Sequence, residues 1–207
     1  MMMPLSKARK GIIISLLLLF TASGGLWAQG AVKQTAKASG PEVCWAIGHP
    51  FIAIKAKRIS KRALQITDSI EQAGIFSDRS GGNLDAFKHS LWMALLSRDI
   101  KPHKALKLGK AHERFNRKQA KKGKGGGDAA ASTMDLWNNK IGAQIGSSHK
   151  NISEQALIKL IIDAVKQGEM RIVRKNAAGE SLDKNGKVID KTLLKNWNNP
   201  RCLVESG

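Results

Sequence analysis

Apolar residues recur every three or four positions through most of residues 41–168, which predicts amphipathic helices rather than strands. Glycine and proline divide this stretch into segments. We expect one or two helices over 41–73, interrupted near Gly48–Pro50, and further helices over 83–100, over 101–122, from Ser132 onward and over 151–168. The last of these is apolar on nearly every side, so we expect it to be central.

The pattern changes after Gly168. Two short β-prone runs, 170–174 and 187–189, bracket a loop that contains Asn185-Gly186, a pair typical of hairpin turns. A last short helix is expected over 190–197. The predicted fold class is therefore mainly α: a single-domain helical bundle over residues 41–207, with a small C-terminal β-hairpin and short helix at 169–197.

The first 28 residues have the pattern of a secretory signal peptide. Lys7, Arg9 and Lys10 precede an apolar run, and small residues precede a cleavage site after Ala28. Residues 29–40 are small and polar and are predicted to form a flexible linker. We expect an exported protein, periplasmic or secreted, that contacts the membrane only through the signal peptide before cleavage. A retained N-terminal membrane helix is the alternative.

The chain is strongly basic, with 35 Lys and Arg against 16 Asp and Glu and a formal net charge of +19. Such a surface favours anionic partners, here envelope polymer or lipid headgroups, although solubility alone also accounts for it. One side of the 101–122 helix gathers cations: Lys104, Lys107, Lys110, Arg114, Lys118 and Lys121. The chain has five Trp, five Phe and no Tyr, too few aromatic residues for a stacking platform that binds single-stranded nucleic acid. We therefore expect no specific nucleic-acid partner. We also expect the protein to be a monomer.

The two cysteines, Cys44 and Cys202, stand near the two ends of the predicted domain. In an oxidising compartment such a pair predicts a disulfide, which would contribute about 4–5 kcal/mol by closing a long loop. A catalytic Cys–His pair is the rival interpretation, and neither cysteine has an activating group beside it in sequence.

Two helices carry ionisable groups beside their apolar faces. On the 83–100 helix, Asp85, His89 and Trp92 share a stripe next to the core side, and Asp85 is placed to orient the imidazole. On the 101–122 helix, His112 falls inside the apolar face and Glu113 lies on its flank. Buried polar groups need partners, so we expect these groups to meet.

The helix that begins at Ser132 repeats this arrangement. Its predicted core face is Met134, Trp137, Ile141 and Ile145, while Asp135 and Asn139 form the neighbouring stripe and Asn138 borders the core. Gly142 and Gly146 would let another helix approach closely. Alternatively, Ser132 and Asp135 form only a capping box.

The stretches LDAFKHSLW, AHE and STMDLWNNKIG resemble a bacterial family of unknown function with the pattern (N/D)AxRHxxW, HE and MDxxNNxxG. The resemblance covers residues 75–150, the expected motif core. The matching positions are Asp85, Ala86, His89, Trp92, His112, Glu113, Met134, Asp135, Asn138, Asn139 and Gly142. Lys88 stands where the pattern has Arg, so a bidentate guanidinium contact is lost. The resemblance implies a shared site and no particular reaction.

The first hypothesis for that site is a hydrolase. His89, His112 and Asp135 would hold zinc or another divalent metal, with Glu113 as general base. Without a metal, His89 would be the base and His112 or Glu113 the acid. The substrate, an anionic envelope or extracellular molecule, would contact Asp85, Lys88, Trp92, Asn138 and Asn139.

The second hypothesis is a non-catalytic protein. The polar cluster would then be a core network that fixes helix register, and the basic helix would bind anionic envelope material. Nothing in the sequence excludes this second hypothesis, but the combination of acid, base and amide groups favours the hydrolase.

Overall fold

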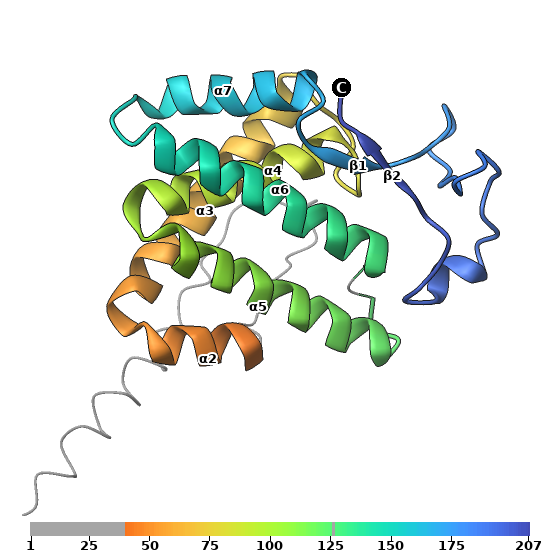
Figure 1. Cartoon of the computed structure of the whole chain (residues 1–207), viewed down its shortest axis with the longest axis horizontal. Helices are drawn as coiled ribbons and strands as arrows, with labels where there is room; N and C mark the ends of the chain where they lie inside the picture. The colour runs from red at the N-terminus through yellow and green to blue at the C-terminus, as the bar shows by residue number, and fades with distance from the viewer. Residues whose placement is uncertain (1–39, 126) are drawn as a thin grey trace, which may run out of the picture. The chain divides into compact units, whose positions relative to one another are not determined.

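The computed structural model describes residues 40–125 and 127–207 (Figure 1). The predicted signal peptide, and the predicted linker up to residue 39, lie outside the described residues. Among the helices that are described, none has both the length and the apolar character that crossing a membrane requires.

The described part of the chain contains six α-helices, and the mainly α fold class is confirmed. They are α2 (Gly40–Gly48), α3 (Pro50–Gln72), α4 (Asn83–Asp99), α5 (Pro102–Lys121), α6 (Ala129–Ser148) and α7 (Glu154–Lys166). Proline opens α3 and α5, where its missing N–H has no helical partner to lose. Asp128 and Ser153 cap α6 and α7 by accepting hydrogen bonds from Ala131 N and Ala156 N.

The central helix is α4, which contacts α3, α5, α6 and α7 (Figure 1). It buries eleven of its residues, including Phe87 and Leu91. The prediction that the 151–168 helix is central is wrong. Only one side of α7 is buried, at Leu157, Ile161, Ala164 and Val165, because this helix covers α4 from the outside.

Two glycines bring α6 and α4 into backbone contact, as the sequence predicts. A Cβ at Gly142 would overlap the carbonyl of Ser90, and one at Gly146 would overlap that of Ala94. The predicted core face of α6 is therefore only partly correct. The helix buries Met134 together with its Asp, Asn and Gly stripe, whereas Trp137 is 38% exposed.

The strands lie at the C-terminal end of the chain. Strand β1 (Arg171–Val173) pairs antiparallel with β2 (Leu203–Glu205), with Ile172 opposite Val204. The predicted small β element is confirmed, but the partner of β1 comes from the last residues of the chain. The run 187–189 forms only an isolated bridge between Leu182 and Val188. The short helix expected over 190–197 is a 3₁₀ turn, η1 (Leu193–Lys195).

The predicted disulfide is wrong. Cys44 is exposed on α2, and Cys202, just before β2, donates a weak hydrogen bond to the Leu182 carbonyl at 3.7 Å. Both are free thiols because α2 packs on α5 while β2 pairs with β1, on opposite sides of the bundle (Figure 1).

Candidate functional site

A cavity of about 230 Å³ lies where α4, α5 and α6 converge. Six of the predicted site residues line it: Asp85, Lys88, His89, His112, Glu113 and Asp135. The turn before α4, the start of α6 and the C-terminal segment complete the wall. The predicted convergence of polar groups from three helices is therefore present in the structure.

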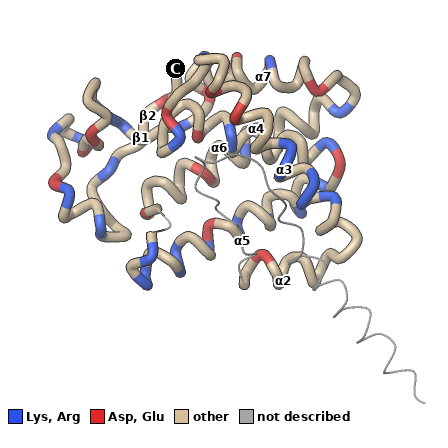
Figure 2. Tube along the Cα trace, turned by 180° about the vertical axis from the view of Figure 1, so that it is seen from behind, with Lys and Arg blue, Asp and Glu red and all other residues tan. Residues whose placement is uncertain are grey.

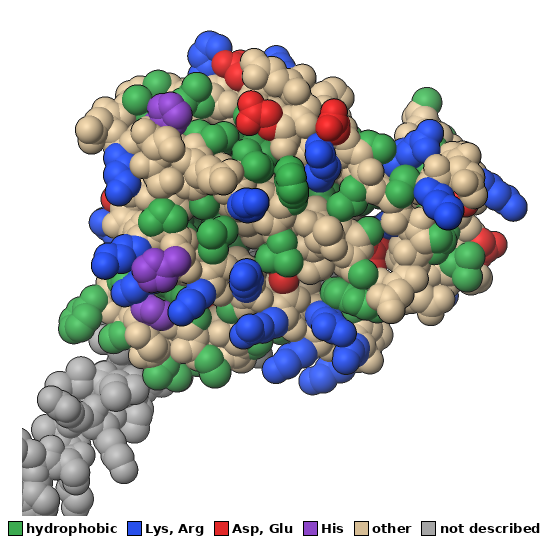
Figure 3. All heavy atoms as spheres, in the orientation of Figure 1, with side chains coloured by type: hydrophobic (Ala, Val, Ile, Leu, Met, Phe, Trp, Pro, Cys, Tyr) green, Lys and Arg blue, Asp and Glu red, His purple; other side chains and the backbone are tan. Residues whose placement is uncertain are grey.

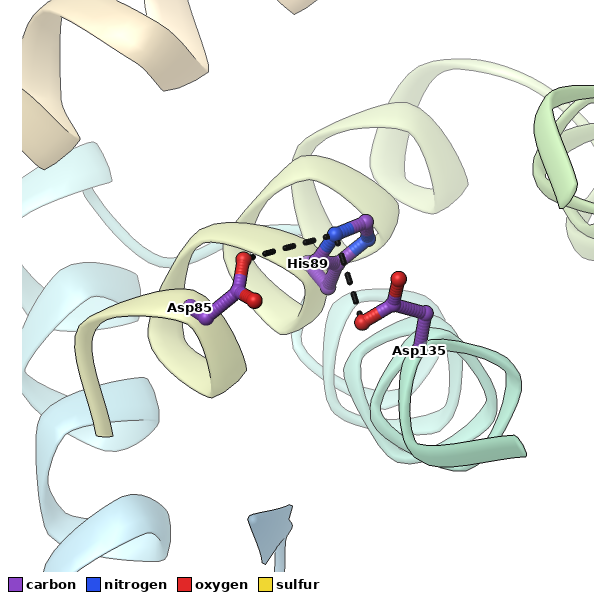
Figure 4. Close-up of side chains that lie close together, drawn as sticks. All are labelled: Asp85, His89 and Asp135. Atoms are coloured by element: carbon purple, nitrogen blue, oxygen red, sulfur yellow. Dashed lines mark ion pairs between the residues drawn. The ribbon is translucent and has the colours of Figure 1, made fainter. Parts of the chain in front are cut away.

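The tightest group in this cavity is Asp85, His89 and Asp135 (Figure 4). Nε2 of His89 lies 3.7 Å from Oδ1 of Asp85 and 3.4 Å from Oδ1 of Asp135. One ligand atom from each residue lies within 4.8 Å of the other two. The imidazole of α4 therefore stands between a carboxylate of its own helix and one from α6.

Burial controls the ionisation of this group. Desolvation, with a contribution from the Lys88 charge, lowers the pKa of His89 to about 3, so the imidazole is neutral at physiological pH. Desolvation, followed by the charges of Asp85 and Glu113, raises the pKa of Asp135 well above its usual range. The pocket thus disfavours charge on both groups.

Asp85 behaves differently because it has two donors. Nζ of Lys88 lies 2.5 Å from Oδ1, and the backbone N–H of Gly81 donates to Oδ2 at 2.8 Å. Burial opposes ionisation of Asp85, but the charges of Lys88 and His89 and these hydrogen bonds together lower its pKa. Asp85 is therefore the ionised carboxylate of the cluster, and Lys88, predicted to bind substrate, is its counter-ion.

The structure exchanges the expected positions of His112 and Glu113. Nδ1 of His112 bonds to Oε1 of Glu42 on α2 at 2.8 Å, and the His112 and His89 ring centroids are 6.4 Å apart. His112 is thus outside the group of three, and Asp85 takes the place predicted for it among the candidate metal ligands. Glu113, expected on the flank, is only 5% exposed.

The pKa of Glu113 shifts as its burial predicts, whereas the pKa of His112 shifts in the opposite direction. Desolvation raises the pKa of Glu113, against the opposing charge of His112 and hydrogen bonds from Ser132 and Asn116. Burial alone would lower the pKa of His112, but its hydrogen bond to Glu42 and the nearby carboxylates raise it. Glu113 is therefore a buried cavity carboxyl with a raised pKa and with hydrogen-bonding neighbours, which makes it a candidate acid–base group.

Three other residues that were predicted to contact substrate make hydrogen bonds or contacts within the protein instead. Nε1 of Trp92 donates to Oγ of Ser60 at 2.8 Å, and Trp92 is outside the cavity wall. Asn138 bonds to both backbone groups of Arg171, at 2.8 and 2.9 Å, and so fixes β1 to α6. Asn139 is buried beside the His89 ring and favours its protonated form.

Unpartnered polar atoms concentrate at this site. Over residues 40–125 and 127–207, six buried side-chain atoms have no well-aligned hydrogen-bond partner. Four of the six are Nδ1 of His89, Oδ1 of Asp135 and both amide atoms of Asn139. A fifth, Nε of Arg201, belongs to another cavity residue. Such atoms lower stability, and five of the six belong either to residues that line the cavity or to Asn139 beside His89, which indicates a function for this site.

Sequence reasoning missed the residues that reach the cavity from distant segments. Arg79 comes from the turn before α4 and pairs with Glu71 and Asp68. Arg201 comes from the C-terminal segment and pairs with Asp128 at 2.8 Å. Neither lies in a periodic pattern or near a motif, so no local signal identifies them.

The family model described as Domain of unknown function (DUF6973) matches residues 43–169 of this chain. The match covers more than half of the sequence and all of α3 to α7, so the protein belongs to this family. No curated protein and no solved structure matches the chain.

Proposed function

We propose that the protein is a hydrolase and that the cavity between α4, α5 and α6 is its active site. The observation that carries the proposal is Glu113, a buried carboxyl with a raised pKa that shares one cavity with His89, Asp85 and Asp135. Carboxyl groups with oppositely shifted pKa values in one pocket are typical of acid–base catalysis.

The roles follow from the protonation states. Glu113 is the general acid–base group, because burial raises its pKa above the usual carboxyl range and so makes it easier for this group to hold a proton and pass it on. His89 is a poor base with a pKa of about 3, so it acts as a neutral ligand or hydrogen-bonding group. With Asp85 and Asp135, it would position the attacking water.

The substrate is expected to be anionic. Lys88, Arg79 and Arg201 line the cavity, and each is paired with a carboxylate that an anionic group could displace. Outside the cavity, Lys and Arg side chains gather along α5 and the loop that follows it (Figures 2 and 3). For an exported protein, this surface favours envelope polymer or lipid headgroups as the source of substrate.

The motif pattern expected for the family supports the same location. The positions that resemble it place Asp85 and His89 on α4, His112 and Glu113 on α5, and Asp135 on α6. We propose that these motifs mark the family's site, with Asn138 and Gly142 supplying the packing that holds α6 in position.

The test uses purified full-length protein and a panel of chromogenic nitrophenyl substrates: a phosphate monoester, a phosphate diester and a neutral acetate ester. We expect hydrolysis of an anionic ester, reduced about 100-fold or more in Glu113→Gln with little change in melting temperature. Glu169→Gln, at an exposed carboxylate, is the matched control. If no ester is hydrolysed and Glu113→Gln only lowers the melting temperature, the cluster is a structural network and the proposal fails.

A further inference from the structure

The three ligand atoms of the cluster lie within 4.8 Å of one another. Oδ1 of Asp85, Nε2 of His89 and Oδ1 of Asp135 surround one side of the cavity, and no hydrogen bond joins Asp135 Oδ1 to any described group (Figure 4). We propose that Asp85, His89 and Asp135 bind one divalent transition-metal ion of the Zn²⁺ or Mn²⁺ kind. This inference deepens the proposed function and rests on it for its catalytic meaning.

The separations suit a metal better than they suit direct hydrogen bonds. At 3.4 and 3.7 Å, the two carboxylate oxygens are too far from Nε2 for good N–H···O geometry. An ion with metal–ligand bonds of about 2.1 Å has tetrahedral ligand–ligand separations of about 3.4 Å. The two separations from Nε2 are close to this value, and the ligand atoms of Asp85 and Asp135 lie within 4.8 Å of each other, so an ion fits with side-chain movements.

The burial of Asp135 supplies the independent reason for a ligand. Its side chain is 10% exposed, and Oδ1 is buried without a hydrogen-bond donor. An unpaired buried carboxylate is costly, and a cation placed between Asp135 and His89 removes that cost. Two carboxylates and a neutral imidazole also balance the charge of a divalent ion.

Neighbouring groups are placed to support the ligands. Asn139 lies close to the His89 imidazole and favours its protonated form, and Nδ1 of that ring has no hydrogen-bond partner among the described residues. A small rotation of the Asn139 amide would let its oxygen accept from Nδ1–H, which leaves the Nε2 lone pair for the metal. The Gly81 N–H already fixes the other oxygen of Asp85.

Lys88 is the competitor for this site. Its ammonium occupies Oδ1 of Asp85, the same atom that would bind the metal. The Lys88 side chain is 32% exposed, so it can turn toward solvent when an ion enters. Removal of the Lys88 charge should therefore raise the affinity for the metal. If the Lys88–Asp85 pair served only to stabilise the fold, its loss would not raise that affinity.

The donor set favours a particular class of ion. One imidazole nitrogen with two carboxylate oxygens suits zinc or manganese, whereas magnesium and calcium prefer oxygen ligands alone. Three protein ligands leave at least one position for water, and a bound metal would lower the pKa of that water for attack on an ester.

The test is zinc binding to chelator-treated, full-length protein, measured by equilibrium dialysis with elemental mass spectrometry and by calorimetry. We expect one high-affinity Zn²⁺ per chain. Asp135→Asn and His89→Gln should each weaken it by more than about 100-fold, and Asn139→Ala by about 10-fold or more. Lys88→Gln should strengthen it. Circular dichroism of each variant checks that it remains folded.

A histidine and a cysteine outside the cluster serve as matched controls, because both side-chain types are common metal ligands. His149→Gln and Cys44→Ser, at exposed positions, should leave the stoichiometry and affinity unchanged. Cobalt substitution should give visible d–d bands typical of tetrahedral coordination, and these should be lost in His89→Gln. Absence of stoichiometric zinc and manganese binding, or wild-type affinity in folded Asp135→Asn, would overturn the inference.

Binding is measured without substrate, so this inference and the proposed function fail separately. If zinc does not bind but Glu113-dependent hydrolysis is present, the metal site is wrong and the hydrolase stands. If zinc binds at the cluster and no ester is hydrolysed, the metal site stands and the proposed reaction is wrong.

Discussion

Oδ1 of Asp135 lies 3.4 Å from Nε2 of His89, buried and without a hydrogen-bond donor. The contact joins α6 to the central helix α4, and it exists because Gly142 and Gly146 let the two backbones touch. The helix pair thus buries an acid against a neutral imidazole instead of an apolar side chain. Such an arrangement lowers stability and is best explained by a function of the site.

The two histidines near the cavity should titrate in different pH ranges. His89 should stay neutral between pH 8 and pH 5, because desolvation lowers its pKa to about 3. His112 should gain its proton above pH 6.5, since Glu42 and the nearby carboxylates raise its pKa against the effect of burial. NMR titration of the imidazole shifts in metal-free protein, assigned with His89→Gln and His112→Gln, measures both. A His89 resonance that titrates near pH 6.5 would contradict the described environment.

Gly142→Ala should destabilise the protein by about 2–4 kcal/mol, because the added Cβ overlaps the Ser90 carbonyl and forces α4 and α6 apart. Gly48→Ala is the matched control, as nothing lies within 4 Å of a Cβ at that position. Urea denaturation of both variants gives the comparison. Equal stability of the two would mean that the helices are not in backbone contact.

Asn138→Ala should also lower stability, by about 2–4 kcal/mol, because it leaves both backbone groups of Arg171 without their partner. Zinc affinity should remain close to that of the unchanged protein, since Asn138 contacts β1 and not the cluster. Denaturation and calorimetry on the same sample separate the two effects. A large loss of zinc affinity with little loss of stability would show that Asn138 supports the metal site and does not mainly hold β1 on α6.

Periodicity predicted the helices well because apolar residues recur at helical spacing and a proline, glycine or capping residue lies near the helix ends. It identified α2 to α7 and the breaks at Pro50 and Pro102. It failed for α6 and α7, where the choice of buried face depends on the neighbouring helix. Gly142 and Gly146 make the polar stripe of α6 the contact face, which no count of apolar residues reveals.

The candidate site could be predicted in outline but not in its pairings. Spacing placed Asp85, His89 and Asp135 beside the core, and the three meet. It did not show that His112 turns to Glu42 on α2, because that contact joins residues 70 positions apart. For the same reason, residue spacing could not predict that Arg201 lines the cavity or that β2 pairs with β1.

The central claim is that the cluster is a functional site and not a packing network, and the unfolding free energy of metal-free Asp135→Asn tests it most directly. The pKa of Asp135 is raised in the folded state, so its contribution to stability is fully present below the unfolded value of 3.8 and is lost as the pH rises through the folded value. We predict that Asp135→Asn is more stable than the unchanged protein by about 1–3 kcal/mol at pH 7.5, with the gain disappearing as the pH falls toward 3.8. A variant that is clearly less stable at pH 7.5 in the presence of chelator would show that Asp135 serves the fold, and would contradict the account.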